Sequence, residues 1–123
     1  MEKDRYQLGI ETLGKLTGDE SDKVVKNIES FSPEFGKMMI EFGFGEVYGR
    51  THFSLKEQEI ITLTSLITQG AGERQLMFHF KAAMNVGLSK EDIVEIIMHC
   101  AAYAGFPKAS VAIEVLQQVM EQE

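Results

Sequence analysis

The sequence has very little cysteine, because Cys100 is the only one among its 123 residues. A single thiol cannot form an internal disulfide, and it cannot supply the ligand set of a metal knuckle. Such sparing use of cysteine is typical of a reducing compartment, where disulfides are rare. The cysteine content therefore favours a cytoplasmic protein.

The sequence also lacks an excess of basic residues and a long apolar run. Lysine and arginine number 12 against 19 acidic residues, a net charge of −7 that would repel a phosphate backbone, so we expect no nucleic-acid partner. The most apolar stretch, residues 93–106, is interrupted by Glu95 and His99. It is too short to cross a bilayer of about 30 Å, which predicts no membrane span. The charged residues 1–5 lead into no apolar segment, so we expect no signal peptide.

The spacing typical of metal and phosphate sites is absent as well. His52, His79 and His99 are scattered, and neither an H-x-x-H nor an H-E-x-x-H pattern occurs. The glycines match no phosphate-binding loop. The sequence therefore predicts no metal site.

What the sequence does have is helical periodicity throughout, with only two prolines. A content of 44% hydrophobic and 25% charged residues is that of an ordinary globular fold. The length suits a single domain over residues 1–123. We therefore expect an all-α protein with at least six helices and no sheet.

Capping signals locate the helix ends. Ser32 precedes a proline and predicts a helix start, after which Gly43 and Gly45 are expected to loosen the chain. A capping box at Ser54 predicts a helix over 54–68. Further helices are expected over 73–86, over 89–104 and after Pro107, with Gly87 and Gly105 at the ends of the first two. The helix at 89–104 is apolar almost all round, which predicts that it is the most buried.

Two polar side chains stand where a helical wheel places apolar ones. Glu59 lies inside the apolar arc of the helix at 54–68, and His79 lies at the edge of the arc at 73–86. A buried carboxylate costs several kcal/mol unless it is paired or protonated. Antiparallel neighbouring helices would make the two a proton-transfer pair. The alternatives are a glutamate at the rim with its head in water and a hydrogen-bonded core histidine.

The helix at 89–104 carries a second polar pair. Glu95 and His99 are four residues apart on one edge, a spacing that favours an intrahelical hydrogen bond. Cys100 projects into the apolar arc, and nothing near it in sequence supplies a positive charge. We therefore expect a buried, inert thiol rather than a nucleophile.

Four segments together resemble the signature of the carboxymuconolactone decarboxylase family, namely residues 48–50, 55–59, 79–87 and 99–107. The H-x3-A-x3-G block followed by Y-x-G-x-P is specific to this family as a set. The resemblance implies a helical bundle of the alkylhydroperoxidase D-like type. It also implies a homo-oligomer, a trimer or a hexamer, with sites near the subunit contacts.

The family has two chemical branches. One decarboxylates γ-carboxymuconolactone without a cofactor during the degradation of aromatic compounds. The other, the alkylhydroperoxidase D type, uses a CxxC pair assisted by a glutamate and a histidine. Those two positions fall on or beside Glu59 and His79, whereas the cysteine positions fall near Gly72 and Gln75. Peroxidase chemistry of that type therefore lacks its thiols.

The resemblance implies a cofactor-free carboxy-lyase that acts on a small lactone acid. In this scheme His79 supplies the proton that replaces CO2, and Glu59 orients His79. Arg50 contacts an anionic group of the substrate, and His99 and Tyr103 bind the substrate. The scheme requires no metal or organic cofactor.

This chain departs from the decarboxylase pattern early in the helix at 54–68. The basic residues usual in that branch appear here as Lys56 and Gln58. Loss of a bidentate carboxylate clamp at Gln58 leaves the substrate open. Two other functions stay open: a peroxiredoxin-type redox protein that uses Cys100 alone, and a non-catalytic oligomeric module in which Glu59 and His79 only satisfy each other.

Overall fold

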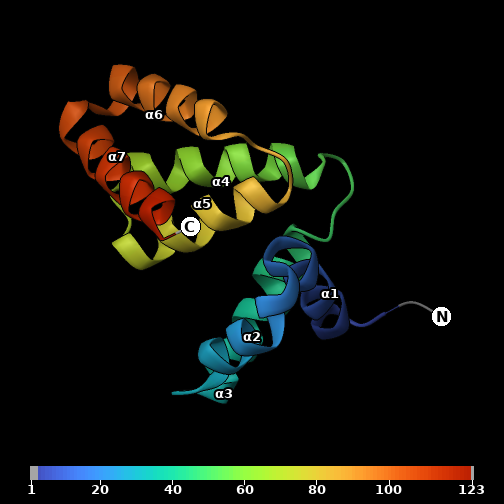
Figure 1. Cartoon of the computed structure of the whole chain (residues 1–123). Coiled ribbons are helices and arrows are strands. Elements are labelled where there is room, and N and C mark those ends of the chain that lie inside the picture. Colours follow the sequence, from blue (N-terminus) through green and yellow to red (C-terminus); the bar gives the residue numbers. More distant parts are fainter. Residues whose placement is uncertain (1–2, 123) are drawn as a thin grey trace. The chain divides into compact units, whose positions relative to one another are not determined.

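The computed structural model describes residues 3–122, and every regular element in that range is helical (Figure 1). The predicted all-α class is confirmed. Contacts divide the chain into two compact units, Met1–Leu55 and Lys56–Glu123. The single-domain assignment over residues 1–123 stays a prediction.

The first unit contains three α-helices, one 3-10 helix and one π-helical segment. They are α1 (Arg5–Thr17), the 3-10 helix η1 (Gly18–Glu20), α2 (Ser21–Glu29), α3 (Pro33–Met38) and the π-helical segment η2 (Met39–Val47). The predicted helix start at Ser32 is confirmed, because its hydroxyl accepts the Phe35 N–H at 3.2 Å.

The prediction that Gly43 and Gly45 loosen the chain is wrong. The backbone continues as η2, in which the Tyr48 N–H donates to the Gly43 carbonyl at 3.0 Å, five residues back. The reason is tertiary, since a Cβ at Gly45 would overlap the Arg5 carbonyl oxygen of α1. The glycine lets α1 and η2 approach closely, and that contact holds the segment helical.

The second unit consists of four helices, α4 (Leu55–Gln69), α5 (Glu73–Asn85), α6 (Lys90–Ala104) and α7 (Phe106–Glu121). Their boundaries lie within one or two residues of those predicted. Ser89 caps α6 in a reciprocal capping box with Asp92, and Gly87 after α5 has a φ of 112°, which favours glycine. No helix among residues 3–122 has the length and apolar character that crossing a membrane requires.

One apolar core fills the second unit, and α7 packs against both α5 and α6 (Figure 1). The prediction that α6 is the most buried helix is wrong. The buried residues of α6 are Ile93, Ile97 and Cys100, whereas α7 buries five residues at helical spacing. Only one face of α6 meets the core, and Met98 and Tyr103 on its other sides are exposed.

Candidate functional site

Glu59 is the only charged side chain that is buried among the described residues, with none of its surface exposed. It lies on α4 four residues before Leu63 and eight before Ile67, both of which are also buried. This i, i+4, i+8 spacing puts the carboxylate on the core-facing side of the helix. The structure therefore rules out the alternative of a glutamate at the rim with its head in water.

His79 on α5 contacts this carboxylate. Its Nδ1 lies 3.0 Å from Oε1 and 3.3 Å from Oε2 of Glu59, although the two residues are 20 positions apart in sequence. The short connection at 70–72 between α4 and α5 makes this possible, because it returns the chain alongside itself. The His79 side chain keeps 13% of its surface exposed, so the imidazole is the accessible member of the pair.

An aromatic ring that the sequence did not single out packs against His79. The ring of Phe78 meets the imidazole edge to face, with centroids 4.8 Å apart and an interplanar angle of 81°. This contact restricts the orientation of the imidazole. The only signal for it in the sequence is that the two residues are adjacent.

Glu59 and His79 are both hydrogen-bonded. Among the described residues, no buried side-chain nitrogen or oxygen lacks a hydrogen-bond partner. A neutral His79 donates its Nδ1–H to the carboxylate of Glu59 and offers Nε2 as an acceptor, whereas an imidazolium donates from both nitrogens. The pair can therefore take up or release a proton at Nε2 while the bond to Glu59 is kept, which suits a general acid or base.

Arg50 is an exposed residue of the first unit and follows η2. Its backbone N–H donates to the Val47 carbonyl at 3.2 Å, so its position depends on the end of that segment. The anion contact expected of Arg50 stays a prediction.

His99 and Tyr103 lie together on α6, one turn apart. Their rings stack, with centroids 5.3 Å apart and an interplanar angle of 16°, and both side chains are exposed. The predicted hydrogen bond between Glu95 and His99 is wrong, since no such bond joins them within residues 3–122. The His99 ring turns toward the following turn of the helix, where Tyr103 offers a larger contact. These two rings form an exposed aromatic surface.

Cys100 is buried, with 2% of its surface exposed, as the sequence predicted. Burial raises the pKa of its thiol above the ordinary value of 9.0. Because the thiolate is the reactive form, the surroundings of Cys100 suppress nucleophilic chemistry.

Metal ligands do not gather in the part of the chain that the structure describes, where no three His, Cys, Asp or Glu side chains form a potential metal site.

Comparison with known proteins identifies the family to which the chain is similar. The family model described as the carboxymuconolactone decarboxylase family matches residues 33–118, a range that includes all five predicted site residues. The chain is 27% identical over 121 residues to a 4-carboxymuconolactone decarboxylase of Acinetobacter baylyi, covering 98% of this chain and 90% of that protein.

Two further relatives are similar over most of their length. The chain is 27% identical over 116 residues to a nitrosuccinic acid decarboxylase of Metarhizium robertsii, covering 94% of this chain and 80% of the relative. It is 28% identical over 100 residues to a 15.0 kDa protein of Paracoccus denitrificans, covering 80% and 75%. Two of these three relatives are thus named decarboxylases.

Proposed function

Because the chain belongs to the carboxymuconolactone decarboxylase family, we propose that it is a cofactor-free decarboxylase of a small carboxylic acid of the γ-carboxymuconolactone type. The observation that carries the proposal is the hydrogen bond between His79 and the fully buried Glu59. A partly exposed imidazole held by a buried carboxylate is an arrangement suited to proton transfer.

The names of the relatives suggest a class of substrate. Carboxymuconolactone and nitrosuccinic acid each combine a carboxylate with an electron-accepting group, a lactone carbonyl in one and a nitro group in the other. Loss of CO2 leaves an electron pair that such a group accepts, as a dienolate or as a nitronate. We therefore propose for this chain a small acid in which a carboxylate is conjugated with, or adjacent to, an electron acceptor.

In the proposed reaction the bond between the carboxylate carbon and the ring carbon breaks. Its electron pair moves into the lactone carbonyl, and CO2 leaves. His79 then protonates the resulting dienolate on carbon from Nε2, while Nδ1 remains hydrogen-bonded to Glu59. The negative charge of Glu59 stabilises the imidazolium before the transfer, and water returns the proton to Nε2 afterwards. No step of this scheme requires a metal or an organic cofactor.

The other predicted residues have supporting roles in this proposal. The guanidinium of Arg50 pairs with a second carboxylate of the substrate, a geometry that guanidinium matches well. The stacked rings of His99 and Tyr103 offer a flat surface for an unsaturated ring.

The redox alternative has less support. Peroxide reduction by a single thiol would depend on Cys100, whose burial and raised pKa both oppose thiolate formation.

The test measures decarboxylation of γ-carboxymuconolactone and of nitrosuccinic acid by the purified protein and two variants. His79→Asn keeps an amide N–H close to the position of Nδ1, so Glu59 retains a donor while Nε2 is lost. Glu59→Gln keeps the shape of the side chain and removes its charge. We expect each to lower kcat by about 10²-fold or more, the usual contribution of a positioned acid or base.

The matched control is His52→Ala, which removes an exposed histidine of the first unit and should leave kcat unchanged. Circular dichroism confirms that each variant is folded. Full decarboxylase activity in His79→Asn would contradict the proposal. If the folded wild-type protein turned over neither acid, the non-catalytic alternative would replace it.

A further inference from the structure

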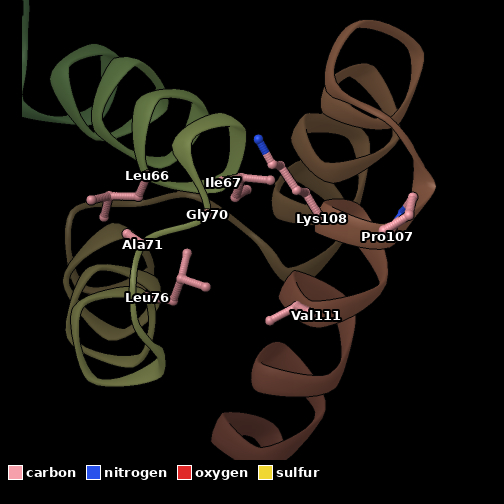
Figure 2. Close-up of a pocket in the computed structure, with 8 residues that line it drawn as sticks. All are labelled: Leu66, Ile67, Gly70, Ala71, Leu76, Pro107, Lys108 and Val111. Carbon is pink, nitrogen blue, oxygen red and sulfur yellow. The ribbon is translucent and has the colours of Figure 1, made fainter.

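A cavity of about 260 Å³ lies in the second unit, where the connection between α4 and α5 meets the start of α7. Figure 2 shows the side chains of Leu76 and Val111 pointing toward each other across it, from α5 and α7. Its apolar lining consists of Leu66, Ile67, Ala71, Leu76, Pro107 and Val111. Neither Glu59 nor His79 lines this cavity.

Lys108 is the one charged residue in the lining. Its alkyl stem runs beside the cavity toward the end of α4 (Figure 2), and its Nζ donates to the Thr68 carbonyl at 2.9 Å. An ammonium group has three N–H donors, so two remain for another acceptor. The hydrogen bond to a helix backbone also holds the ammonium group at the rim of the cavity. The Lys108 side chain therefore loses less conformational entropy when a ligand binds.

We propose that this cavity is a binding site for a small monocarboxylic acid with one apolar ring, of which benzoate is the simplest example. An apolar cavity of about 150 Å³ admits benzene, so the larger volume here accommodates a ring and part of its carboxylate. The ring is buried against the apolar walls, and the carboxylate pairs with the ammonium of Lys108. The proposed decarboxylase substrate is less suited to these walls, because it carries more polar groups than one lysine can satisfy.

The test is a titration followed by NMR of the methyl groups of the full chain, with three probes. Benzoate carries both the ring and the charge, toluene only the ring, and acetate only the charge. We expect benzoate to shift the methyl signals of Leu66, Leu76 and Val111 with a Kd on the order of 1 mM, the scale for so small a ligand. Toluene should shift the same signals, and acetate should not.

Two variants separate the contribution of the Lys108 charge from that of the apolar cavity. Lys108→Met keeps most of the stem and should weaken benzoate binding by about tenfold while leaving toluene unaffected, because only the charged hydrogen bond is lost. Val111→Phe should fill the cavity and abolish binding of both. Val111 is 44% exposed, so the larger ring can be accommodated; Val111→Met is the substitute if the phenylalanine variant fails to fold. Lys90→Met on α6 is the control and should change nothing.

Four results would overturn the proposal. They are an absence of shifts at about 20 mM benzoate, equal shifts with acetate, equal weakening of benzoate and toluene by Lys108→Met, and unchanged binding in a folded Val111 variant.

Discussion

At the scale of single residues, the buried carboxylate of Glu59 is tolerated because one imidazole nitrogen contacts both of its oxygens. A buried ion pair is weak evidence for added stability, since desolvation offsets much of the attraction. Removing one partner of a buried ion pair is nevertheless costly, by roughly 3–5 kcal/mol, because the remaining charge loses its compensation. The pair is therefore weak evidence for added stability, and it is consistent with the proposed role of His79 in proton transfer.

Cys100 allows a test at the same scale. Cys100→Ser should leave any native activity within a few-fold, because the thiol has no role in the proposed chemistry. In the wild-type protein, the raised pKa of Cys100 keeps the thiol protonated at pH 7.5, so labelling by iodoacetamide should be slow until the protein is unfolded. Rapid labelling of the folded protein, or loss of a peroxide-reducing activity in Cys100→Ser, would favour the redox alternative.

At the scale of elements, two glycines allow α1 and η2 to pack closely. A Cβ at Gly9 would overlap the carbonyl oxygen of Ile40, and a Cβ at Gly45 would overlap that of Arg5. Backbone carbonyls cannot move aside as flexible side chains do. The close approach of these helices therefore depends on glycine at both positions.

Alanine substitutions in α1 test this dependence. Gly9→Ala should destabilise the protein by about 1–3 kcal/mol, because the added methyl group separates two packed helices. The control is Gly14→Ala in the same helix, where a Cβ would meet nothing within 4 Å. That substitution should stabilise the protein by about 0.5–1 kcal/mol, since alanine has the higher helix propensity. Urea unfolding measures both, and equal effects of the two substitutions would contradict the packing argument.

The N-terminus of α6 gives the chain a defined response to acid. The Ser89 backbone N–H donates to Asp92 at 2.8 Å, and the Asp92 N–H donates to the Ser89 hydroxyl at 3.0 Å. The Ser89 backbone N–H, and after it the Ser89 hydroxyl, lower the pKa of the Asp92 carboxyl below its ordinary value of 3.8 by hydrogen bonding to it. A lowered folded pKa means that the stabilisation is complete above the unfolded pKa and is lost as pH falls through the folded one.

Thermal unfolding as a function of pH checks this response. The wild-type protein should be more stable than Asp92→Asn at pH 6, and the difference should disappear at about pH 2, where the aspartate is protonated. Glu95→Gln, an exposed position in the middle of α6, is the control and should show no such convergence. A difference independent of pH would show that the charge of Asp92 has no part in capping.

At the scale of the whole molecule, both units expose large apolar side chains. They include Phe31, Phe35, Met38 and Phe42 in the first unit and Met98, Tyr103 and Phe106 in the second. Exposed apolar clusters commonly mark association surfaces. With the family membership, they support the proposal that the chain forms a homo-oligomer.

The expected assembly is a hexamer of 13.8 kDa chains, with a trimer as the alternative. Light scattering coupled to size-exclusion chromatography measures the mass directly. A stable monomer at micromolar concentration would contradict the proposal.

The sequence by itself determined the features that depend on neighbouring residues. Ser32 and Ser89 start helices because their side chains bond to an N–H three positions on, and Gly87 supplies the backbone angle that ends one. Apolar periodicity likewise placed Glu59 and His79 on or beside the core-facing sides of α4 and α5. All of these signals are contained within a few turns of one helix, which is why they can be recognised without a fold.

Only the tertiary structure decided the features that depend on distant partners. The return of α5 along α4 brought His79 to Glu59, and the contact with α1 kept η2 helical through its glycines. The fold also made α7 the most buried helix of the second unit, and it placed Lys108 against Thr68, 40 positions away in sequence. Periodicity shows which face of a helix is apolar, but not which element covers that face, because the free energy of burial depends on area and is not directional.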